Sequence, residues 1–271
     1  MIAAMNAAQS LRRWARVARL ALHLARGLTI AALFFPLQSA RHRKFEIERW
    51  SRQLLKILNV RLSVHGSPAT YRSRAVMLVA NHVSWLDIFA IDAVVASRFV
   101  AKSEVRGWPL IGWLCERVGT LFIQRARRHD TARINHAVGE ALTAGDVFAV
   151  FPEGTTTDGS TVLKFHASLL APALEAGAAV QPVALRFERS DGSLCTQAAY
   201  DGEKSLWDAL MGITSEREIV AQVSFLEPIA AEQNHRRDLA RIARDAIVLT
   251  LFPQARDSRT DTAGDLQVAA R

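Results

Sequence analysis

Residues 75–87 read AVMLVANHVSWLD, and this stretch decides how the rest of the chain is interpreted. The apolar run 75–80 is typical of a buried strand, and the run from Trp85 to about Ala96 predicts a helix. His82 therefore lies where a strand gives way to a helix, and Asp87 follows five residues later. Because loops at the carboxyl ends of strands in open α/β sheets often carry reactive groups, we expect a functional site here.

The spacing of His82 and Asp87 limits how they can interact. Five helical residues rotate by about 500°, so the two side chains do not share a helix face. We expect His82 in the loop and Asp87 in the first helical turn, pointing back at it. The aspartate would hold one imidazole nitrogen and leave the other as a base that can deprotonate a substrate hydroxyl directly. The structural alternative is a capping box of Ser84 and Asp87, in which Asp87 only closes the helix start.

The remainder of the chain alternates between predicted strands and helices. The strands are expected at 60–64, 75–80, 99–101, 120–124, 147–151, 180–185 and 219–226, and the helices at 85–96, 131–144, 168–176 and 238–251, with a loop and helix through 108–113. This alternation predicts an α/β fold with a largely parallel or mixed central sheet flanked by helices. We divide the 271 residues into an N-terminal helical hairpin at 1–59, the α/β domain at 60–253 and a mobile polar tail at 254–271.

Composition narrows the partners of the protein. The formal net charge of +8 and the pI of about 10.3 indicate an anionic partner or surface. The chain has two cysteines, Cys115 and Cys195, which lie far apart and in no metal-binding spacing. A disulfide framework is therefore not indicated, and a reducing compartment is expected.

The first forty residues predict attachment to a membrane surface. Basic side chains at helical spacing form one stripe: Arg12, Arg16, Arg19, His23 and Arg26. The apolar run Leu28–Leu37 has about half of the ~20 residues that a spanning helix needs. We expect a helix lying in the membrane interface, with its arginines toward anionic headgroups and the apolar run dipping inward. A second helix, Phe45–Leu58, would complete the hairpin; the alternative for the first segment is a signal peptide.

Three further segments follow predicted strands. In FPEGTTTDG at 151–159, amides around Gly154 and Thr155 can form a nest for an anion, and Glu153 can bind a polyol hydroxyl; an ordinary turn is the alternative. In GTLFIQR at 119–125, Arg125 can bind a phosphate, or belong to a solvated basic run. In VQPVAL at 180–185, Pro182 indicates an edge or a strand start, and we interpret this segment as structural.

The order of these blocks resembles the glycerolipid acyltransferase family, of the 1-acyl-sn-glycerol-3-phosphate acyltransferase type. Its Asn-His-x-Ser-x-x-Asp block is similar to residues 81–87, its Gly-x-x-Phe-Ile-x-Arg block to 119–125, its Phe-Pro-Glu-Gly-Thr block to 151–155, and its Val-x-Pro-Val block to 180–183. The Lys102-x-Glu104 pair is similar as well. Two departures concern the acceptor: Thr156 stands where arginine is frequent in the family, and the sequence KFHA at 164–167 replaces a Phe-Lys-x-Gly element.

The resemblance implies the site and the reaction. It implies His82 and Asp87 as catalytic residues and Arg125, Glu153, Gly154 and Thr155 as substrate-binding residues, supported by Asn81, Ser84, Lys102 and Gly119. The reaction would move an acyl chain from acyl carrier protein or coenzyme A to the free hydroxyl of a lysolipid. The expected acceptor is 1-acyl-sn-glycerol-3-phosphate, giving phosphatidic acid, with lyso-ornithine lipid as the alternative. No metal or other cofactor is implied, and the expected place is the cytoplasmic face of the inner membrane.

Two other classes of function stay open at this point. In a thioester or lipid hydrolase, water would replace the acceptor hydroxyl. A non-enzymatic module that binds membranes or nucleic acid would also fit the net charge. We expect no nucleic acid partner, because aromatic residues are not interleaved with the arginines as a nucleic-acid platform needs.

Overall fold

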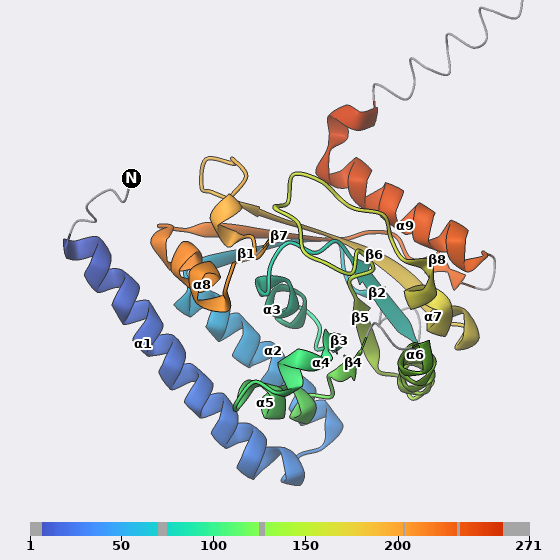
Figure 1. The fold of residues 1–271 in the computed structure, drawn as a ribbon, viewed down its shortest axis with the longest axis horizontal. Helices are drawn as coiled ribbons and strands as arrows, with labels where there is room; N and C mark the ends of the chain where they lie inside the picture. Colours follow the sequence, from blue (N-terminus) through green and yellow to red (C-terminus); the bar gives the residue numbers. More distant parts are fainter. Residues whose placement is uncertain (1–6, 70–74, 125–127, 203, 232–233, 257–271) are drawn as a thin grey trace, which may run out of the picture.

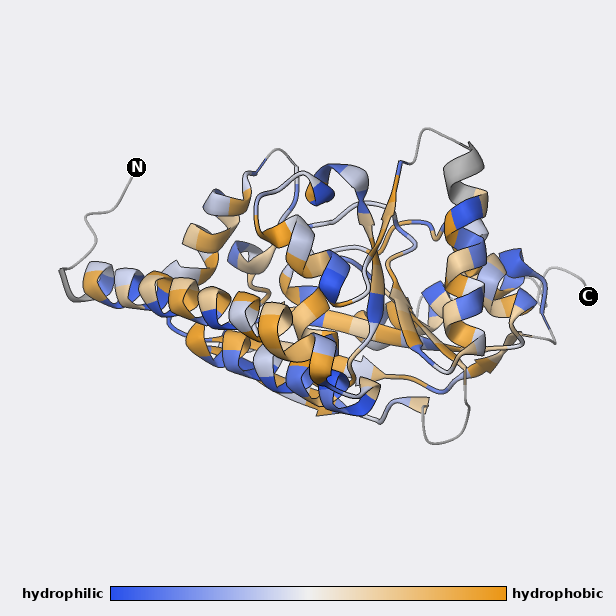
Figure 2. Cartoon of the chain, turned by 90° about the horizontal axis from the view of Figure 1, so that it is seen from below, coloured by the Kyte–Doolittle hydropathy of each residue, from blue (hydrophilic) through white to orange (hydrophobic). Residues whose placement is uncertain are grey.

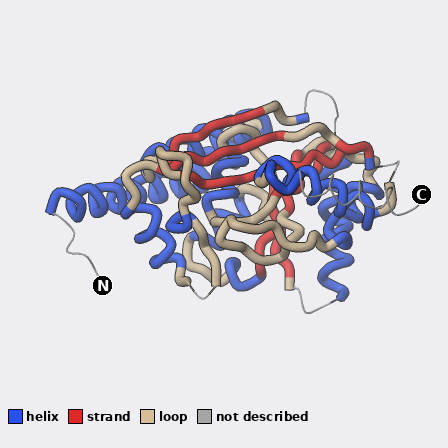
Figure 3. The backbone as a smooth tube through the Cα atoms, turned by 90° about the horizontal axis from the view of Figure 1, so that it is seen from above, coloured by secondary structure: helices blue, strands red, loops and turns tan. Residues whose placement is uncertain are grey.

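The fold is an α/β sheet with helices on both faces and a helical hairpin at one side (Figures 1 and 3). In a computed structural model of the chain, residues 7–69, 75–124, 128–202, 204–231 and 234–256 are described. The described strands are β1 (Val60–His65), β2 (Val76–Ala80), β3 (Arg98–Lys102), β4 (Leu121–Ile123), β5 (Val147–Val150), β6 (Ala179–Glu188), β7 (Ile219–Phe225) and β8 (Ile229–Ala230).

The strand order is β1-β7-β6-β2-β5-β3-β4, with β8 paired to β6. The run from β6 to β4 is parallel, whereas β6 and β7 are antiparallel and β1 is parallel to β7. The mixed, largely parallel sheet is therefore as predicted. All five residues of β2 are buried, which explains the unbroken apolar run at the centre of the sheet.

Two layers of helices cover the sheet. Helices α6 (Arg128–Thr143), α7 (Ala171–Glu175) and α9 (Arg236–Leu251) pack on one face, where Met77 and Val79 of β2 point. The other face receives Val76 and Leu78 and is covered by α2 (Ala40–Ile57), α3 (Leu86–Asp92) and α8 (Leu206–Ser215). Burial of each large apolar side chain in these layers stabilises the fold by about 1.5–3 kcal/mol. The strands are accordingly the most uniformly hydrophobic part of Figure 2.

Several elements differ from the predictions. Helix α3 ends at Asp92, and the helix expected at 168–176 is a 3₁₀ turn, Ala167–Leu170, followed by α7. Helix α8, strand β8 and the short helix α4 (Ser103–Arg106) were not predicted, whereas the loop and helix expected through 108–113 correspond to the start of α5 (Ile111–Arg117). The start of the predicted tail forms a 3₁₀ turn at Pro253–Arg256, and residues 257–271 lie outside the described residues.

The prediction for Pro182 was wrong, because this residue lies within β6, between β2 and β7. The position tolerates a proline for a local reason. The ladder with β7 begins at Val183, and β8 pairs with Ala179 and Val180, so Pro182 lies between two ladders. Its carbonyl still accepts a hydrogen bond from the Leu226 amide at 2.9 Å.

The N-terminal hairpin consists of α1 (Ala7–Thr29), a π-helical turn (Ile30–Phe34), a 3₁₀ turn (Phe35–Leu37) and α2. Its stripe of basic residues does not face outward as a whole, which corrects the prediction. The Arg16 guanidinium donates to the carbonyls of Thr214, Glu216 and Arg217 at the end of α8, at 3.3, 2.7 and 3.0 Å. His23 is buried and stacks on Trp50 of α2, with ring centroids 4.6 Å apart. The inner edge of the stripe therefore binds the protein.

Candidate active site

The sheet brings the segments 81–87 and 151–159 together at the carboxyl ends of two strands. Strands β2 and β5 are parallel neighbours, with Val79 in register with Val150, so the loops that follow them leave the sheet side by side. The rings of His82 and Phe151 stack across these loops, with centroids 4.0 Å apart and an interplanar angle of 11°. Two segments about seventy residues apart in the sequence therefore form one site.

Asp87 holds the loop and the imidazole with a single oxygen. Its Oδ2 accepts from His82 Nδ1 at 2.7 Å, from the Val83 amide at 2.7 Å and from the Ser84 amide at 2.9 Å. The Asp87 side chain is 0% exposed and that of His82 is 21% exposed. Because an ionised carboxylate only accepts, His82 Nδ1 carries a proton, and in the neutral imidazole the lone pair is therefore on Nε2.

Asp87 makes the predicted contact with His82 and one half of the alternative capping box. The aspartate lies in the first turn of α3 and points back at His82, as predicted. It also accepts from the Ser84 amide, which is one half of a capping box; the Asp87 amide, however, donates to the Ser84 carbonyl at 3.1 Å rather than to its hydroxyl. Its Oδ1 is buried and has no hydrogen-bond partner within the described part of the chain. The catalytic role of the pair stays a prediction.

Glu153 lies beneath His82 and is 4% exposed. Its Oε1 accepts from the His82 amide at 2.8 Å, and its Oε2 accepts from the Leu163 amide at 2.7 Å. Burial raises the pKa of the Glu153 carboxyl, while these two amides act in the opposite direction. The structure therefore gives Glu153 a role in fixing the loop backbone; its predicted contact with a polyol hydroxyl stays a prediction.

Asn81 and Thr157 complete the attachment of the histidine loop. The Asn81 amide group exchanges two hydrogen bonds with the Leu185 backbone of β6, at 2.9 and 2.8 Å. The Thr157 amide donates to the His82 carbonyl at 2.9 Å. The peptide groups on both sides of the His82 side chain are thus held by the loop that follows β5. Ser84 is buried, and its hydroxyl accepts from the Leu86 amide at 3.3 Å.

The hydrogen bonds described for the remaining predicted residues involve partners other than His82 and Asp87. Gly154 has a φ of 75°, which favours glycine, and its amide donates to the Phe151 carbonyl, so this amide is used in a turn. Thr155 is exposed beside it. Lys102 is exposed at the end of β3, the strand next to β5. Gly119 precedes β4, at the far end of the sheet, where its carbonyl accepts from Arg98 Nε at 3.0 Å. Arg125 lies outside the described residues.

More distant segments of the chain also contact the site, and these contacts were not predicted from the sequence. The Tyr200 amide donates to the Val83 carbonyl at 2.9 Å, and the Thr156 hydroxyl donates to the Tyr200 carbonyl. Arg244 of α9 donates to the loop that carries Leu163. Neither Tyr200 nor Arg244 lies in a recognisable motif, so one sequence contains no signal for these contacts.

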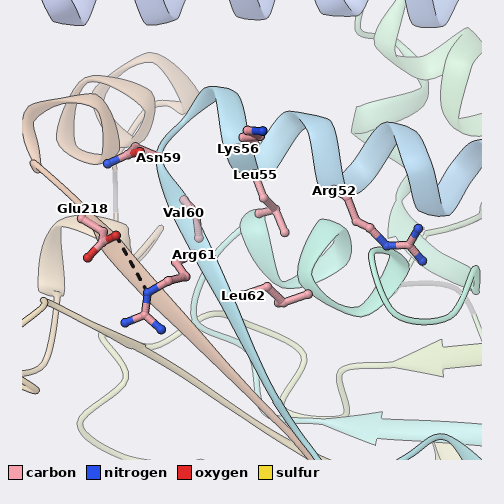
Figure 4. Close-up of a pocket in the computed structure, with 8 residues that line it drawn as sticks. All are labelled: Arg52, Leu55, Lys56, Asn59, Val60, Arg61, Leu62 and Glu218. Atoms are coloured by element: carbon pink, nitrogen blue, oxygen red, sulfur yellow. Dashed lines mark ion pairs between the residues drawn. The ribbon is translucent and has the colours of Figure 1, made fainter.

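A separate hollow of about 370 Å³ lies between α2 and β1. It is lined by Arg52, Leu55, Lys56, Asn59, Val60, Arg61, Leu62 and Glu218. Figure 4 shows that Arg61 and Glu218 form an ion pair at its rim, 3.9 Å apart, and the hollow includes none of the predicted site residues. Within the described residues, no group of three or more His, Cys, Asp or Glu side chains is placed to hold a metal ion.

Comparison with known proteins identifies the family. A family model described as Acyltransferase matches residues 61–186. A lyso-ornithine lipid O-acyltransferase of Pseudomonas aeruginosa is 40% identical over 211 residues, which cover 78% of this chain and 80% of that protein. A 1-acyl-sn-glycerol-3-phosphate acyltransferase of Neisseria meningitidis is 40% identical over 175 residues, covering 65% and 68%. The chain belongs to this acyltransferase family and is an acyltransferase of the lysolipid type.

A solved structure agrees with the fold. The crystal structure of the 1-acyl-sn-glycerophosphate acyltransferase PlsC from Thermotoga maritima matches with a TM-score of 0.63 and 23% identity. The match covers 89% of this chain and 98% of that one. It confirms the predicted architecture of a mixed α/β sheet flanked by helices.

The two buried carboxyls of α3 should respond differently to substitution. Asp87→Asn should lower acyl transfer by about two to four orders of magnitude, because an uncharged amide neither fixes the imidazole tautomer nor stabilises the imidazolium that forms during transfer. Asp92→Asn should leave transfer near normal, because its oxygen can still accept from the Ser97 amide, now at 2.9 Å. Steady-state rates of both purified variants test this, and a loss of activity in Asp92→Asn equal to that in Asp87→Asn would contradict it.

Asp92 should also affect how stability depends on pH. Burial raises the pKa of Asp92 well above its ordinary value. Because the folded pKa then exceeds the unfolded one, the folded state binds more protons between the two values, and stability falls as pH rises through that window. Asp92→Asn cannot ionise, so its melting temperature should fall less than that of the wild type over this range. If the melting temperatures of the two proteins fell by the same amount over this pH range, the expectation would be refuted.

Proposed function

We propose that this acyltransferase moves an acyl chain from a thioester donor to the free hydroxyl of a lysolipid, with His82 as general base. His82 Nε2 removes the hydroxyl proton as the oxygen attacks the thioester carbonyl. The tetrahedral intermediate then collapses, the carbon–sulfur bond breaks, and the leaving thiolate takes the proton from His82. The observation that carries this proposal is the 2.7 Å bond between His82 Nδ1 and the buried Asp87, which leaves Nε2 free to act.

Direct attack by the acceptor is supported by the environment of two candidate nucleophiles, Ser84 and Cys195. Ser84, the hydroxyl closest to His82 in the sequence, is fully buried and bonded to backbone. Cys195 is buried, and burial raises the pKa of its thiol, which disfavours the thiolate. A covalent acyl-enzyme is therefore not part of the proposal. The donor is proposed to be acyl carrier protein or coenzyme A carrying the acyl chain.

The first proposed acceptor is 1-acyl-sn-glycerol-3-phosphate, named by the resemblance and by the relative from Neisseria. Lys102 and Arg125 are proposed to supply positive charge for its phosphate. One observation favours the second candidate, a lyso-ornithine lipid. Thr156 stands where an arginine is frequent, and its hydroxyl is bonded to the Tyr200 carbonyl, so this position adds no charge for a phosphate. An ornithine headgroup carries a carboxylate and an ammonium instead.

The general-base role is tested by His82→Ala. We expect a folded, membrane-bound protein whose acyl transfer is lower by about two to four orders of magnitude. Glu153 and Thr157 hold only the backbone of residue 82, so these bonds can persist in the variant. Transfer is measured by mass with acyl carrier protein and coenzyme A thioesters as donors. Near-normal transfer by His82→Ala would rule the assignment out.

The acceptor is decided by competition between the two lysolipids. Purified wild-type protein receives one donor and equimolar 1-acyl-sn-glycerol-3-phosphate and lyso-ornithine lipid, and both products are measured by mass. We expect acylation of at least one lysolipid and little free fatty acid. Release of free fatty acid without acylated product would instead identify a thioester hydrolase.

We propose that the hairpin holds the enzyme at the cytoplasmic face of the inner membrane. Residues 1–59 contain eleven Lys and Arg residues against two Glu, which suits an anionic surface. Apolar side chains are exposed along the outer side of α1 and the turns that follow: Leu11 (73%), Trp14 (54%), Leu22 (72%), Leu33 (62%) and Leu37 (86%). The contact between Trp14 and the exposed Trp207, with centroids 6.3 Å apart, extends this face to α8.

The hairpin is proposed to lie in the interface rather than to cross the bilayer. The longer segment Gln9–Leu37 has 29 residues and, by length and composition alone, could cross a bilayer, although its apolar run Leu28–Leu37 is only about half of the length needed. Its inner face, however, packs on α2 through His23 and on α8 through Arg16. Crossing would carry charged residues of α2 into hydrocarbon, such as Arg49 and Arg52, and that is costly.

Leucine substitutions on α1 test the membrane contact. The variant Leu11→Ser, Leu22→Ser, Leu33→Ser should bind anionic phospholipid vesicles at least tenfold more weakly, because each removed side chain is exposed and no packed core is disturbed. Leu249→Ser is the matched control, since Leu249 is 38% exposed on α9, at the opposite end of the molecule (Figure 1). Equal vesicle binding by the triple variant and this control would refute the proposed face.

A further inference from the structure

Arg244 lies on α9, outside the residues 61–186 that match the family model, yet it contacts the active-site loop. Its Nε donates to the Leu163 carbonyl at 2.9 Å and its second terminal nitrogen donates to the Val162 carbonyl at 2.7 Å. A guanidinium fork that holds two consecutive carbonyls fixes the local path of the backbone. Its remaining nitrogen forms an ion pair with Asp245 at 3.5 Å.

Leu163 connects this fork to the catalytic histidine. Its carbonyl accepts from Arg244, and its amide donates to Glu153 Oε2 at 2.7 Å. The other oxygen of Glu153 accepts from the amide of His82 at 2.8 Å. Each hydrogen bond in this sequence is short enough to restrict its partners, so the position of Arg244 bears on the position of the His82 peptide.

The bond from Leu163 matters because Glu153 is a buried carboxylate. Burial raises the pKa of Glu153, and the amides of Leu163 and His82 oppose that effect. The titratable groups that face it are His82, which when protonated favours the ionised form of Glu153, and Asp87, which disfavours it. Loss of the Leu163 amide would remove the larger of the two amide contributions. The carboxylate would then be protonated at higher pH, and its hold on the His82 amide would weaken.

We propose that Arg244 is a positioning residue for His82, acting through Leu163 and Glu153. The inference rests on the proposed role of His82 as general base. Arg244 touches neither substrate nor the reacting atoms. Its contribution is to keep the loop at 159–165 in the place where the Leu163 amide meets Glu153, so that the imidazole is aimed correctly when the lysolipid hydroxyl arrives.

The variant Arg244→Gln tests this with a matched control on the same helix. Arg241 lies one turn earlier, its side chain is 63% exposed, and it forms ion pairs only with Asp238 and Asp245 among the described contacts. With palmitoyl coenzyme A or palmitoyl acyl carrier protein as donor and the lysolipid that the wild type accepts, Arg244→Gln should lower kcat about tenfold. Both KM values should stay within about twofold. Arg241→Gln should match the wild type, and Arg244→Lys should recover part of the loss.

A double-mutant cycle separates positioning from a general loss of stability. If Arg244 acts through Glu153, the variant Arg244→Gln, Glu153→Gln should be no slower than Glu153→Gln alone. If Arg244 only ties α9 to the core, the two losses in kcat should multiply. Multiplied losses, or an Arg244→Gln variant as active as Arg241→Gln, would overturn the proposal.

Hydrogen exchange gives a result that does not depend on activity. In Arg244→Gln, peptides covering residues 159–165 and the amide of residue 82 should exchange at least tenfold faster, and in Arg241→Gln they should not. If the wild type acylates neither lysolipid, the proposed function fails while this measurement still tests the connection. Unchanged exchange at both places in Arg244→Gln would overturn the proposal even if the enzyme is active.

Discussion

Parallel pairing of β2 with both β5 and β6 is the constraint on which the site depends. Because the three strands run in the same direction, the segments that follow them leave the sheet on the same side, at the carboxyl ends of the strands. Asn81 is tied there to Leu185 of β6, and His82 is tied to Glu153 beyond β5. The buried apolar strands thus determine where the polar residues that follow them are placed.

The contact between His82 and Asp87 can be predicted from the sequence, whereas contacts that depend on how the strands are aligned cannot. His82 and Asp87 are five residues apart at a strand-to-helix transition, so their contact follows from short-range geometry. The partner of Glu153 does not, because it depends on the alignment of Val79 with Val150 across two strands. Glu153 was expected to bind a polyol hydroxyl, which stays a prediction; its bonds to the amides of His82 and Leu163 were not foreseen. Its side chain satisfies the backbone that the loop leaves unpaired.

The N-terminal helix shows the same limit in a different form. Helical periodicity groups Arg12 to Arg26 on one stripe, but it does not say what the stripe faces. Arg16 and His23 turn out to face α8 and α2, because α8 ends with carbonyls that need donors and Trp50 offers a ring to stack on. Because helix α8 was not predicted, its contact with Arg16 could not be predicted either. The outward apolar side of α1 follows from that packing.

The histidine loop is held from two directions by segments beyond the family match. On the side of the hairpin, Tyr200 binds Val83 and Thr156, and the chain then enters α8, which Arg16 of α1 binds at its far end. On the other side, α9 reaches the loop through Arg244 and Glu153. A general base on a surface loop needs such support, because displacing its imidazole by about 1 Å can slow the catalysed reaction about a hundredfold. The proposed catalytic pair is therefore local in sequence, while the contacts that hold it span the whole fold.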